Sequence, residues 1–283
     1  MTNSKADMPH RNTPLASPQL LLAGLAIMLA NTTFAAVPTE GTSAINTAAG
    51  SALTAIGEAR DAKSGQLLYR EYHYRQPGSG LGSVEYRNPE QQLLNTKTLD
   101  FNHAPWAPAF QQVDLRTGEL IFARWQGKTL TMGYRESQRD SIRQERVDSQ
   151  QLVADAGFDS FIRERWNALV GDQPQRFEFA IPARLDTLTL VAQRRDCEES
   201  GAVQEAVCFR VVPENWLFAL LADPIDLKYA VQDRQLLSFR GLSNITDADG
   251  KSQVVTIRYL HAEPGGYLAD DQAIDWPQAG ASS

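Results

Sequence analysis

The sequence predicts a mainly β fold (α+β) in which a long curved antiparallel meander, a half-barrel, wraps around one inserted amphipathic helix. Short segments that alternate polar and apolar residues recur from residue 56 to residue 260, and turns rich in Gly, Pro and Asp separate them. This is the pattern of antiparallel strands, of which we count roughly ten. A single amphipathic helical pattern interrupts the series, with none of the regular strand–helix alternation of a nucleotide-binding α/β fold.

The first 35 residues have the composition of a secretory signal peptide. Basic residues precede the apolar run Leu20 to Ala30, and small residues follow it, which is the order that such signals share. The run is shorter than the ~20 residues that a membrane-spanning helix needs. We therefore expect residues 1–35 to be cleaved and the mature protein to be periplasmic and soluble, with no transmembrane span. An uncleaved N-terminal anchor is the alternative.

Three further regions follow the signal peptide. Residues 36–55 are small and polar, too poor in large apolar groups to build a core, and predict a flexible linker. Residues 56–262 predict a single β-rich domain. Residues 263–283 are acidic and rich in Gly, Ala and Ser, which favours a disordered tail.

Strand patterns fill the first half of the domain, and helical patterns appear in the second. Three strands joined by tight glycine turns are expected between residues 110 and 134. An amphipathic helix is expected over 159–170, capped by Asp159. A second helical segment, over 214–222, lies between two prolines and is apolar nearly all round, so it must be buried or meet a partner.

The stretch from Gln235 to Leu260 predicts a long antiparallel hairpin. Alternate residues of its second arm are apolar, and Gly250 supplies the positive φ that a short hairpin loop requires. The first arm keeps its alternation only if the phase shifts near Gly241, so we expect a bulge or a sharp bend there.

Two cysteines, Cys197 and Cys208, are eleven residues apart. In an exported protein such a pair favours a structural disulfide that joins the two arms of a hairpin. A zinc site would need more Cys or His residues close by.

The charge of the chain limits its partners. The net charge is −7, and we find no run of Lys and Arg, so the sequence predicts no attraction to nucleic acid or to anionic membranes. The sequence also gives no reason to expect a metal or a cofactor, because it contains only four histidines and no glycine-rich phosphate loop before a helix.

Catalytic patterns are weak. Glu71 and His73 fall on one face of a strand, as a general base and its orienting carboxylate would. A solvated outer face of the sheet explains the two residues more simply, so we expect them there and assign no catalytic residue.

Several aromatic residues are candidates for lining an apolar cavity between helix and sheet, as lipid-binding folds require. The alternative is that they fill the core. The candidates are Phe158, Phe161, Trp166, Trp216 and Phe218.

An export signal, a run of antiparallel strands, an inserted aromatic helix and a closing strand that reads VVTIRY together resemble the carrier superfamily of the bacterial outer-membrane lipoprotein localisation (Lol) system. The resemblance covers residues 56–260 and lies in the order of elements. It implies a curved sheet that holds acyl chains or other hydrophobic ligands, and hence a binding or carrier protein without catalysis. A cell-envelope protein–protein interaction module and an envelope hydrolase are the alternatives.

Overall fold

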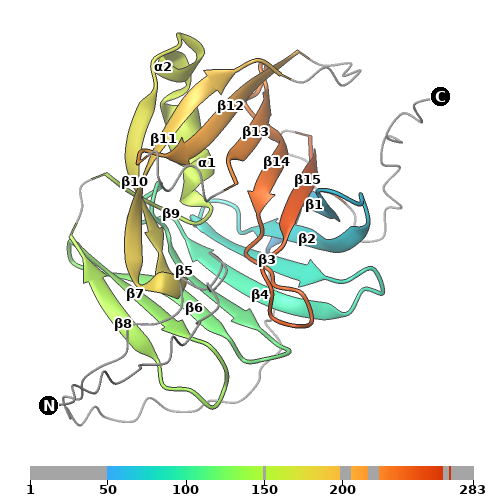
Figure 1. Ribbon diagram of the computed structural model, residues 1–283, viewed down its shortest axis with the longest axis vertical. Helices are drawn as coiled ribbons and strands as arrows, with labels where there is room; N and C mark the ends of the chain where they lie inside the picture. Colours follow the sequence, from blue (N-terminus) through green and yellow to red (C-terminus); the bar gives the residue numbers. More distant parts are fainter. Residues whose placement is uncertain (1–49, 149–150, 198–204, 216–222, 264–267, 269–283) are drawn as a thin grey trace, which may run out of the picture. The chain divides into compact units, whose positions relative to one another are not determined.

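Fifteen strands form one long curved sheet that does not close (Figure 1). The computed structural model describes residues 50–148, 151–197, 205–215, 223–263 and 268. All of them lie in one compact unit, 44–283. The predicted mainly β fold with a long curved meander is confirmed, with more strands than the sequence pattern revealed.

The chain begins in the middle of the sheet and adds strands one after another to one edge. It then crosses to the opposite edge and adds strands back to the middle. The first eight strands are β1 (Ala52–Asp61), β2 (Leu67–Arg75), β3 (Leu81–Arg87), β4 (Leu93–Asp100), β5 (Ala109–Asp114), β6 (Leu120–Gln126), β7 (Thr129–Arg135) and β8 (Arg143–Val147). The remaining seven are β9 (Leu152–Ala154), β10 (Gln175–Ile181), β11 (Asp186–Arg195), β12 (Ala206–Pro213), β13 (Ile225–Ala230), β14 (Leu236–Leu242) and β15 (Val254–His261).

The spatial order runs from β8 down to β1, then to β15, and from β15 down to β9. All neighbouring pairs are antiparallel except β9 and β10, which are parallel. The first and last strands therefore pair in the middle of the sheet, with Ala55 opposite His261. Strands β8 and β9, which are consecutive in the chain, form the two edges.

The predicted hairpin over residues 235–260 is confirmed as the pair β14 and β15. Gly250 has φ +77° in the connecting turn, as expected. The predicted bulge at Gly241 is wrong, because β14 pairs with β15 without a break from Ser238 to Leu242. The irregularity lies against β13 instead, where Leu237 is the additional residue. Leu236 and Phe239 are three residues apart, and in a regular strand two such side chains point to opposite faces. Because both pack in the inner core, a bulge must lie between them.

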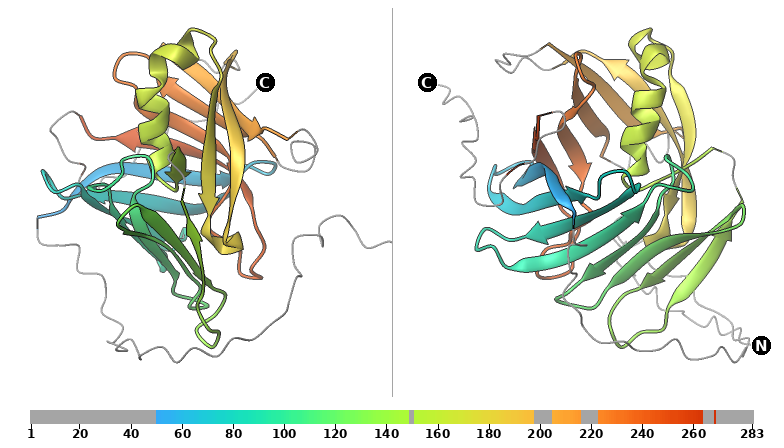
Figure 2. Two further views of the ribbon diagram at one scale, coloured as in Figure 1. Left: turned by 90° about the vertical axis from the view of Figure 1, so that its left-hand side faces the viewer. Right: turned by 180° about the vertical axis from the view of Figure 1, so that it is seen from behind.

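Two short helices, α1 (Gly157–Glu164) and α2 (Trp166–Val170), replace the single helix expected over 159–170. Figure 2 shows α1 inside the curve of the sheet. The N-cap residue is Ala156, so the cap expected at Asp159 is wrong. Asp159 lies in the first turn, where its carboxylate pairs with Arg163 at 2.9 Å. A 3-10 helix, Pro182–Arg184, joins β10 to β11. The second predicted helical segment falls largely outside the described residues, including Trp216 and Phe218.

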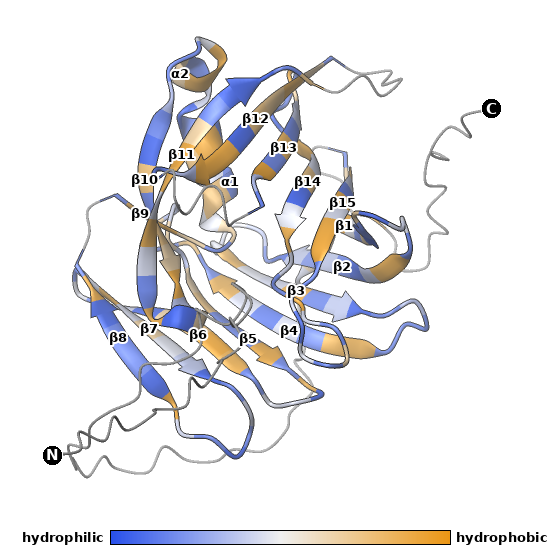
Figure 3. Cartoon of the chain, viewed as in Figure 1, coloured by the Kyte–Doolittle hydropathy of each residue, from blue (hydrophilic) through white to orange (hydrophobic). Residues whose placement is uncertain are grey.

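Apolar side chains fill the inner face of the sheet in two clusters. Hydrophobic and hydrophilic bands alternate along several strands in Figure 3, because successive side chains point to opposite faces. The first cluster lies mainly on β1 to β7, with contributions from β9, β10 and β15, and includes Tyr69, Val84, Phe110, Met132 and Ile257. The second lies between the helices and β9 to β13 and includes Phe161, Trp166, Phe177, Phe209 and Tyr229.

The predicted disulfide is present. Cys197 and Cys208 are bonded with Cα atoms 5.2 Å apart, and they link the end of β11 to β12. Strand β1 begins at Ala52, slightly before the expected domain start at residue 56. The predicted signal peptide and most of the predicted tail lie outside the described residues. Within the described ranges, no helix has the length and apolar character needed to cross a membrane.

Candidate functional site

Three of the five aromatic residues predicted to line a cavity, Phe158, Phe161 and Trp166, lie where α1 and α2 meet the sheet, and the other two lie outside the described residues. The exposed fraction of Phe161 is 2% and that of Trp166 is 7%, while Phe158 is half-buried. The ring centroids of Phe161 and Phe177 are 4.6 Å apart, and those of Trp166 and Phe209 are 5.6 Å apart. Side chains therefore occupy the inner face at these positions.

One hollow of 140 Å³ opens beside this aromatic cluster. Its lining residues are Trp106, Gln151, Phe161, Arg165, Gln175 and Arg176. Trp106 and Phe161 meet edge to face with centroids 5.3 Å apart and form an apolar wall. Two arginines supply positive charge: Arg165 lies 5.0 Å from the centroid of the Trp106 ring, and exposed Arg176 is bonded to Glu214 at 2.7 Å. The hollow thus combines an aromatic wall with cationic groups.

Trp106 also fixes the position of α1. Its indole Nε1 donates a hydrogen bond to Glu164 at 2.8 Å, at the end of the helix. At the start of the helix, a Cβ atom on Gly157 would lie 2.0 Å from the Trp106 carbonyl oxygen, so the absence of a side chain permits this contact. The Pro-rich loop that carries Trp106 therefore positions the helix.

A buried ion pair joins β4 to the start of α1. The Lys97 ammonium lies 2.6 Å from the Asp155 carboxylate, and the exposed side-chain fractions are 4% and 14%. Burial alone would lower the pKa of Lys97, but Asp155 and Tyr86 raise it above its usual value. Asp155 has φ +45°, a conformation that Asp tolerates better than most residues.

Glu71 and His73 lie on the inner face, so the expectation of a solvated outer face is wrong. Glu71 is 5% exposed, and its carboxylate accepts hydrogen bonds from His73 Nε2 at 2.9 Å and from the Tyr259 hydroxyl at 3.2 Å. Burial and the charge of Glu71 raise the pKa of Tyr259 well above its usual value.

A glycine makes this contact possible. Gly57 of β1 is the cross-strand partner of both Glu71 and Tyr259, so these two side chains meet over a residue that has none. A Cβ atom on Gly57 would lie 2.8 Å from Tyr259 Cε1 and 3.1 Å from Glu71 Oε2. The bond from Tyr259 to Glu71 therefore depends on Gly57.

The chemistry available to Glu71, His73 and Tyr259 is proton transfer. The His73 side chain is 30% exposed, so one ring nitrogen remains for a second partner. Among the hydrogen bonds of the described residues, none joins the His73 imidazole to a Ser, Thr or Cys side chain. The arrangement therefore lacks the pairing of nucleophile and base that covalent catalysis requires.

His261, at the end of β15, makes the stability of the protein depend on pH. Its Nε2 donates to the Leu236 carbonyl at 2.7 Å. Burial, followed by the nearby His73 and Arg163, lowers its pKa below the ordinary 6.5. The unfolded chain therefore binds a proton near pH 6.5 that the folded protein takes up only at lower pH, so stability falls as the pH drops below 6.5.

We expect the thermal midpoint to be lower at pH 5.5 than at pH 7.5, and His261→Gln to reduce that difference because it removes the titrating group. Calorimetry at the two pH values measures both midpoints. The control is His103→Gln, since His103 is exposed and its replacement should leave the difference unchanged. Equal effects of the two substitutions would contradict the role of His261.

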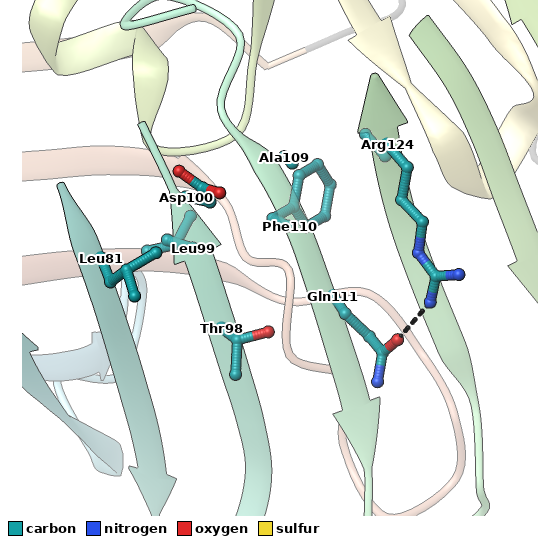
Figure 4. A pocket seen from close by; sticks show the side chains of 9 residues that line it. Leu81, Thr98, Leu99, Asp100, Ala109, Phe110, Gln111 and Arg124 are labelled. Carbon is teal, nitrogen blue, oxygen red and sulfur yellow. Dashed lines mark hydrogen bonds between the residues drawn. The ribbon is translucent and has the colours of Figure 1, made fainter. Parts of the chain in front are cut away.

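A second hollow, of 290 Å³, lies across β3 to β6. Its lining residues are Leu81, Thr98, Leu99, Asp100, Ala109, Phe110, Gln111, Ala123 and Arg124. In Figure 4 Gln111 and Arg124 lie side by side, and Arg124 Nη2 donates to Gln111 Oε1 at 2.7 Å. Thr98, Gln111 and Arg124 alternate with inner-face residues, so the hollow is a depression in the outer face of the sheet.

The sequence pattern did not single out Trp106, Lys97 or Arg165. Two prolines marked the Trp106 loop only as irregular, and Lys97 occupies a strand position that reads as ordinary polar alternation. Among the described residues, no group of three or more His, Cys, Asp or Glu is placed to hold a metal ion. No protein-family model matches the chain, and no curated protein matches it.

Proposed function

We propose that the protein binds or carries a lipid or another hydrophobic ligand without covalent chemistry, at the hollow beside α1. The observation that carries this proposal is the combination of an aromatic wall, Trp106 and Phe161, with two arginines among the lining residues, Arg165 and Arg176. An apolar wall suits an acyl chain, and arginine suits a carboxylate or phosphate. The ligand class is therefore an amphiphile with an anionic head group.

The size of the hollow indicates how the ligand enters. Its 140 Å³ is below the ~300 Å³ at which small-molecule pockets begin, so an acyl chain enters only if α1 moves from the sheet. The contact to be broken at the C-terminal end of α1 is the bond between Trp106 and Glu164. A second expected break is the edge-to-face contact of Trp106 and Phe161.

The test is binding of a fluorescent fatty acid to delipidated protein. We expect saturable binding by the wild type, and a loss of affinity of about tenfold or more in the double variant Arg165→Glu and Arg176→Glu, because two attractive charges become repulsive. Arg139→Glu is the control, since Arg139 is exposed and lies outside the hollow. Native mass spectrometry of protein purified without delipidation identifies any ligand already bound.

Two outcomes would oppose the proposal. One is the absence of fatty-acid uptake by wild-type protein together with a clean apo mass. The other is an equal affinity for the double variant and the wild type, which would show that the anionic head does not meet these arginines.

The exposed edge strand β8 gives little support to the alternative that the protein is an interaction module. Four of the five residues of edge strand β8 are exposed, and Arg143, Glu145 and Arg146 are among them. Charged side chains on an edge strand discourage pairing with another chain. The other surface considered for a partner, around Trp216, lies outside the described residues.

A further inference from the structure

Cationic side chains are aligned across the outer face of the sheet, one on each of seven consecutive strands from β2 to β11. In spatial order they are Arg70, Arg60, Arg258, Arg240, Lys228, Arg210 and Arg195. We call these seven residues, with Glu58 and Asp226, the outer-face belt. Neighbouring strands are ~4.8 Å apart, so the seven strands bring these charges into one continuous band.

Strand register places the belt in two adjacent cross-strand rows. One row runs through Arg70, Glu58, Arg258, Ser238, Lys228, Cys208 and Arg195. The other runs through Arg60, Thr256, Arg240, Asp226 and Arg210. Their neighbours along each strand, such as Ile257, Phe239 and Leu227, belong to the inner core clusters, so the belt residues face outward.

The belt carries a surplus of five positive charges in a chain whose net charge is −7. Each of its two carboxylates is shared between two arginines. Glu58 lies 2.7 Å from Arg60 and 3.1 Å from Arg70. Asp226 pairs with Arg195 and with Arg210, both at 2.8 Å. The carboxylates therefore orient the guanidinium groups without neutralising the belt.

Two exposed leucines flank the central cations on the same face. Leu242 is 54% exposed and lies two residues beyond Arg240 on β14. Leu260 is 36% exposed and lies two residues beyond Arg258 on β15. Cations next to exposed apolar side chains are typical of surfaces that bind at a membrane interface, where the charges meet phosphate and the apolar groups enter the acyl boundary.

We propose that the outer-face belt binds the surface of a membrane that contains anionic phospholipid. The charges are spread over seven strands, which suits many separate head groups better than one small anion. Neither row contains an aromatic residue, whereas proteins that bind single-stranded nucleic acid stack bases on aromatic rings. The exposed leucines also favour a membrane over a nucleic acid, because apolar side chains can enter the acyl boundary.

The negative net charge of the chain does not prevent this binding. Electrostatic interactions are screened over ~8 Å at physiological ionic strength, so the membrane attracts the belt much more strongly than it repels acidic groups on distant faces. A basic residue near an anionic leaflet contributes about 1 kcal/mol. The proposal is independent of ligand binding at the hollow beside α1, which lies against the inner face.

Vesicle cosedimentation tests the proposal with two compositions, phosphatidylcholine alone and phosphatidylcholine mixed with phosphatidylglycerol. We expect the full chain to bind only the anionic vesicles, and salt to weaken this binding. The double variant Arg240→Glu and Arg258→Glu should bind at least about tenfold more weakly. The matched control, Lys128→Glu and Arg139→Glu, has the same net charge and replaces exposed residues outside the belt, so it should bind as the wild type does.

Several outcomes would overturn the proposal. Equal weakening in the two double variants would mean that only net charge matters. Equal binding of the wild type to both vesicle compositions, or to neither, would exclude recognition of anionic head groups. This measurement needs no variant. Tighter binding to a single-stranded oligonucleotide than to anionic vesicles would favour a nucleic-acid partner. Fatty-acid uptake is measured separately, so failure of one proposal leaves the other standing.

Discussion

Replacing Lys97 with methionine is expected to lower the free energy of unfolding by about 3 kcal/mol, the lower end of the range for a buried ion pair that loses one partner. The substitution keeps most of the apolar stem but removes the ammonium group, which lies 5.7 Å from the centroid of the Tyr86 ring and 5.8 Å from that of the Phe110 ring. It leaves the Asp155 carboxylate, 14% exposed, without its cation. The lower end of the range applies because Asp155 keeps some contact with water and a bond from the Ala156 amide.

Urea denaturation measures this effect against a matched surface pair. Lys251 and Asp249 are 3.7 Å apart and more than 70% exposed, so Lys251→Met should change stability by no more than about 0.5 kcal/mol. Adding Asp155→Asn to Lys97→Met should recover part of the loss, because asparagine is neutral and accepts the same positive φ. A loss for Lys97→Met no larger than that of the surface control would contradict a stabilising role for the buried pair.

Replacing Gly57 with valine is expected to destabilise the protein by about 3 kcal/mol or more. Overpacking alone typically costs about 1–3 kcal/mol, and here the added atoms would also separate Tyr259 from Glu71. A Cβ at this position already meets Tyr259 and Ile257 at 2.8 Å and 3.0 Å. The buried Glu71 carboxylate would then lose a hydrogen bond, and an unsatisfied buried group adds to the cost.

The control for Gly57→Val is Gln193→Val on β11, which introduces the same side chain at an exposed strand position. Its effect should stay within about 0.5 kcal/mol. The ultraviolet titration of tyrosine gives a second readout, because Tyr259, whose pKa is raised in the wild type, should titrate closer to its usual value once it leaves Glu71. Unchanged melting and an unchanged tyrosine titration would show that the inner face accommodates a side chain at Gly57.

Features that depend on local pattern were predicted from the sequence. The meander, the helix near Phe161 and the Cys197–Cys208 disulfide all follow from residue spacing over short distances. The break at Arg165, which divides the helix in two, has no such signal. The bulge was expected at Gly241 because glycine tolerates irregular backbone, but core packing of Leu236 and Phe239 places it near Leu237.

The buried contact of Glu71 with His73 and Tyr259 was not predicted, because both faces of β2 are covered. Tyr72, which faces outward, is only 9% exposed and packs with Leu53 and Ile56 in a third apolar cluster. Alternation in sequence distinguishes the two faces of a strand but not which face is the core. The polar pair Glu71 and His73 is therefore expected from its sequence on a solvated face, although it lies on the inner one.

Prediction of the outer-face belt requires the strand order as well as the sequence. Its cations occur singly along the chain, from Arg60 to Arg258, so no run of basic residues appears in the sequence. Only the register of seven strands brings them together. A net charge of −7 is correct for the chain and still gives no information about the charge of a single face.

The pairing of β1 with β15 at the centre of the sheet has a kinetic consequence. A ribosome makes β1 before the other strands of the sheet and β15 after them, so an emerging chain presents β1 with one edge unsatisfied until β15 has been made. Contacts between residues so distant in sequence slow folding, because a long loop must close before the contact stabilises it. During that interval the open edge is available for wrong pairings. The two halves of the sheet, β1 to β8 and β9 to β15, join at the β1–β15 pair through a late step that requires β15.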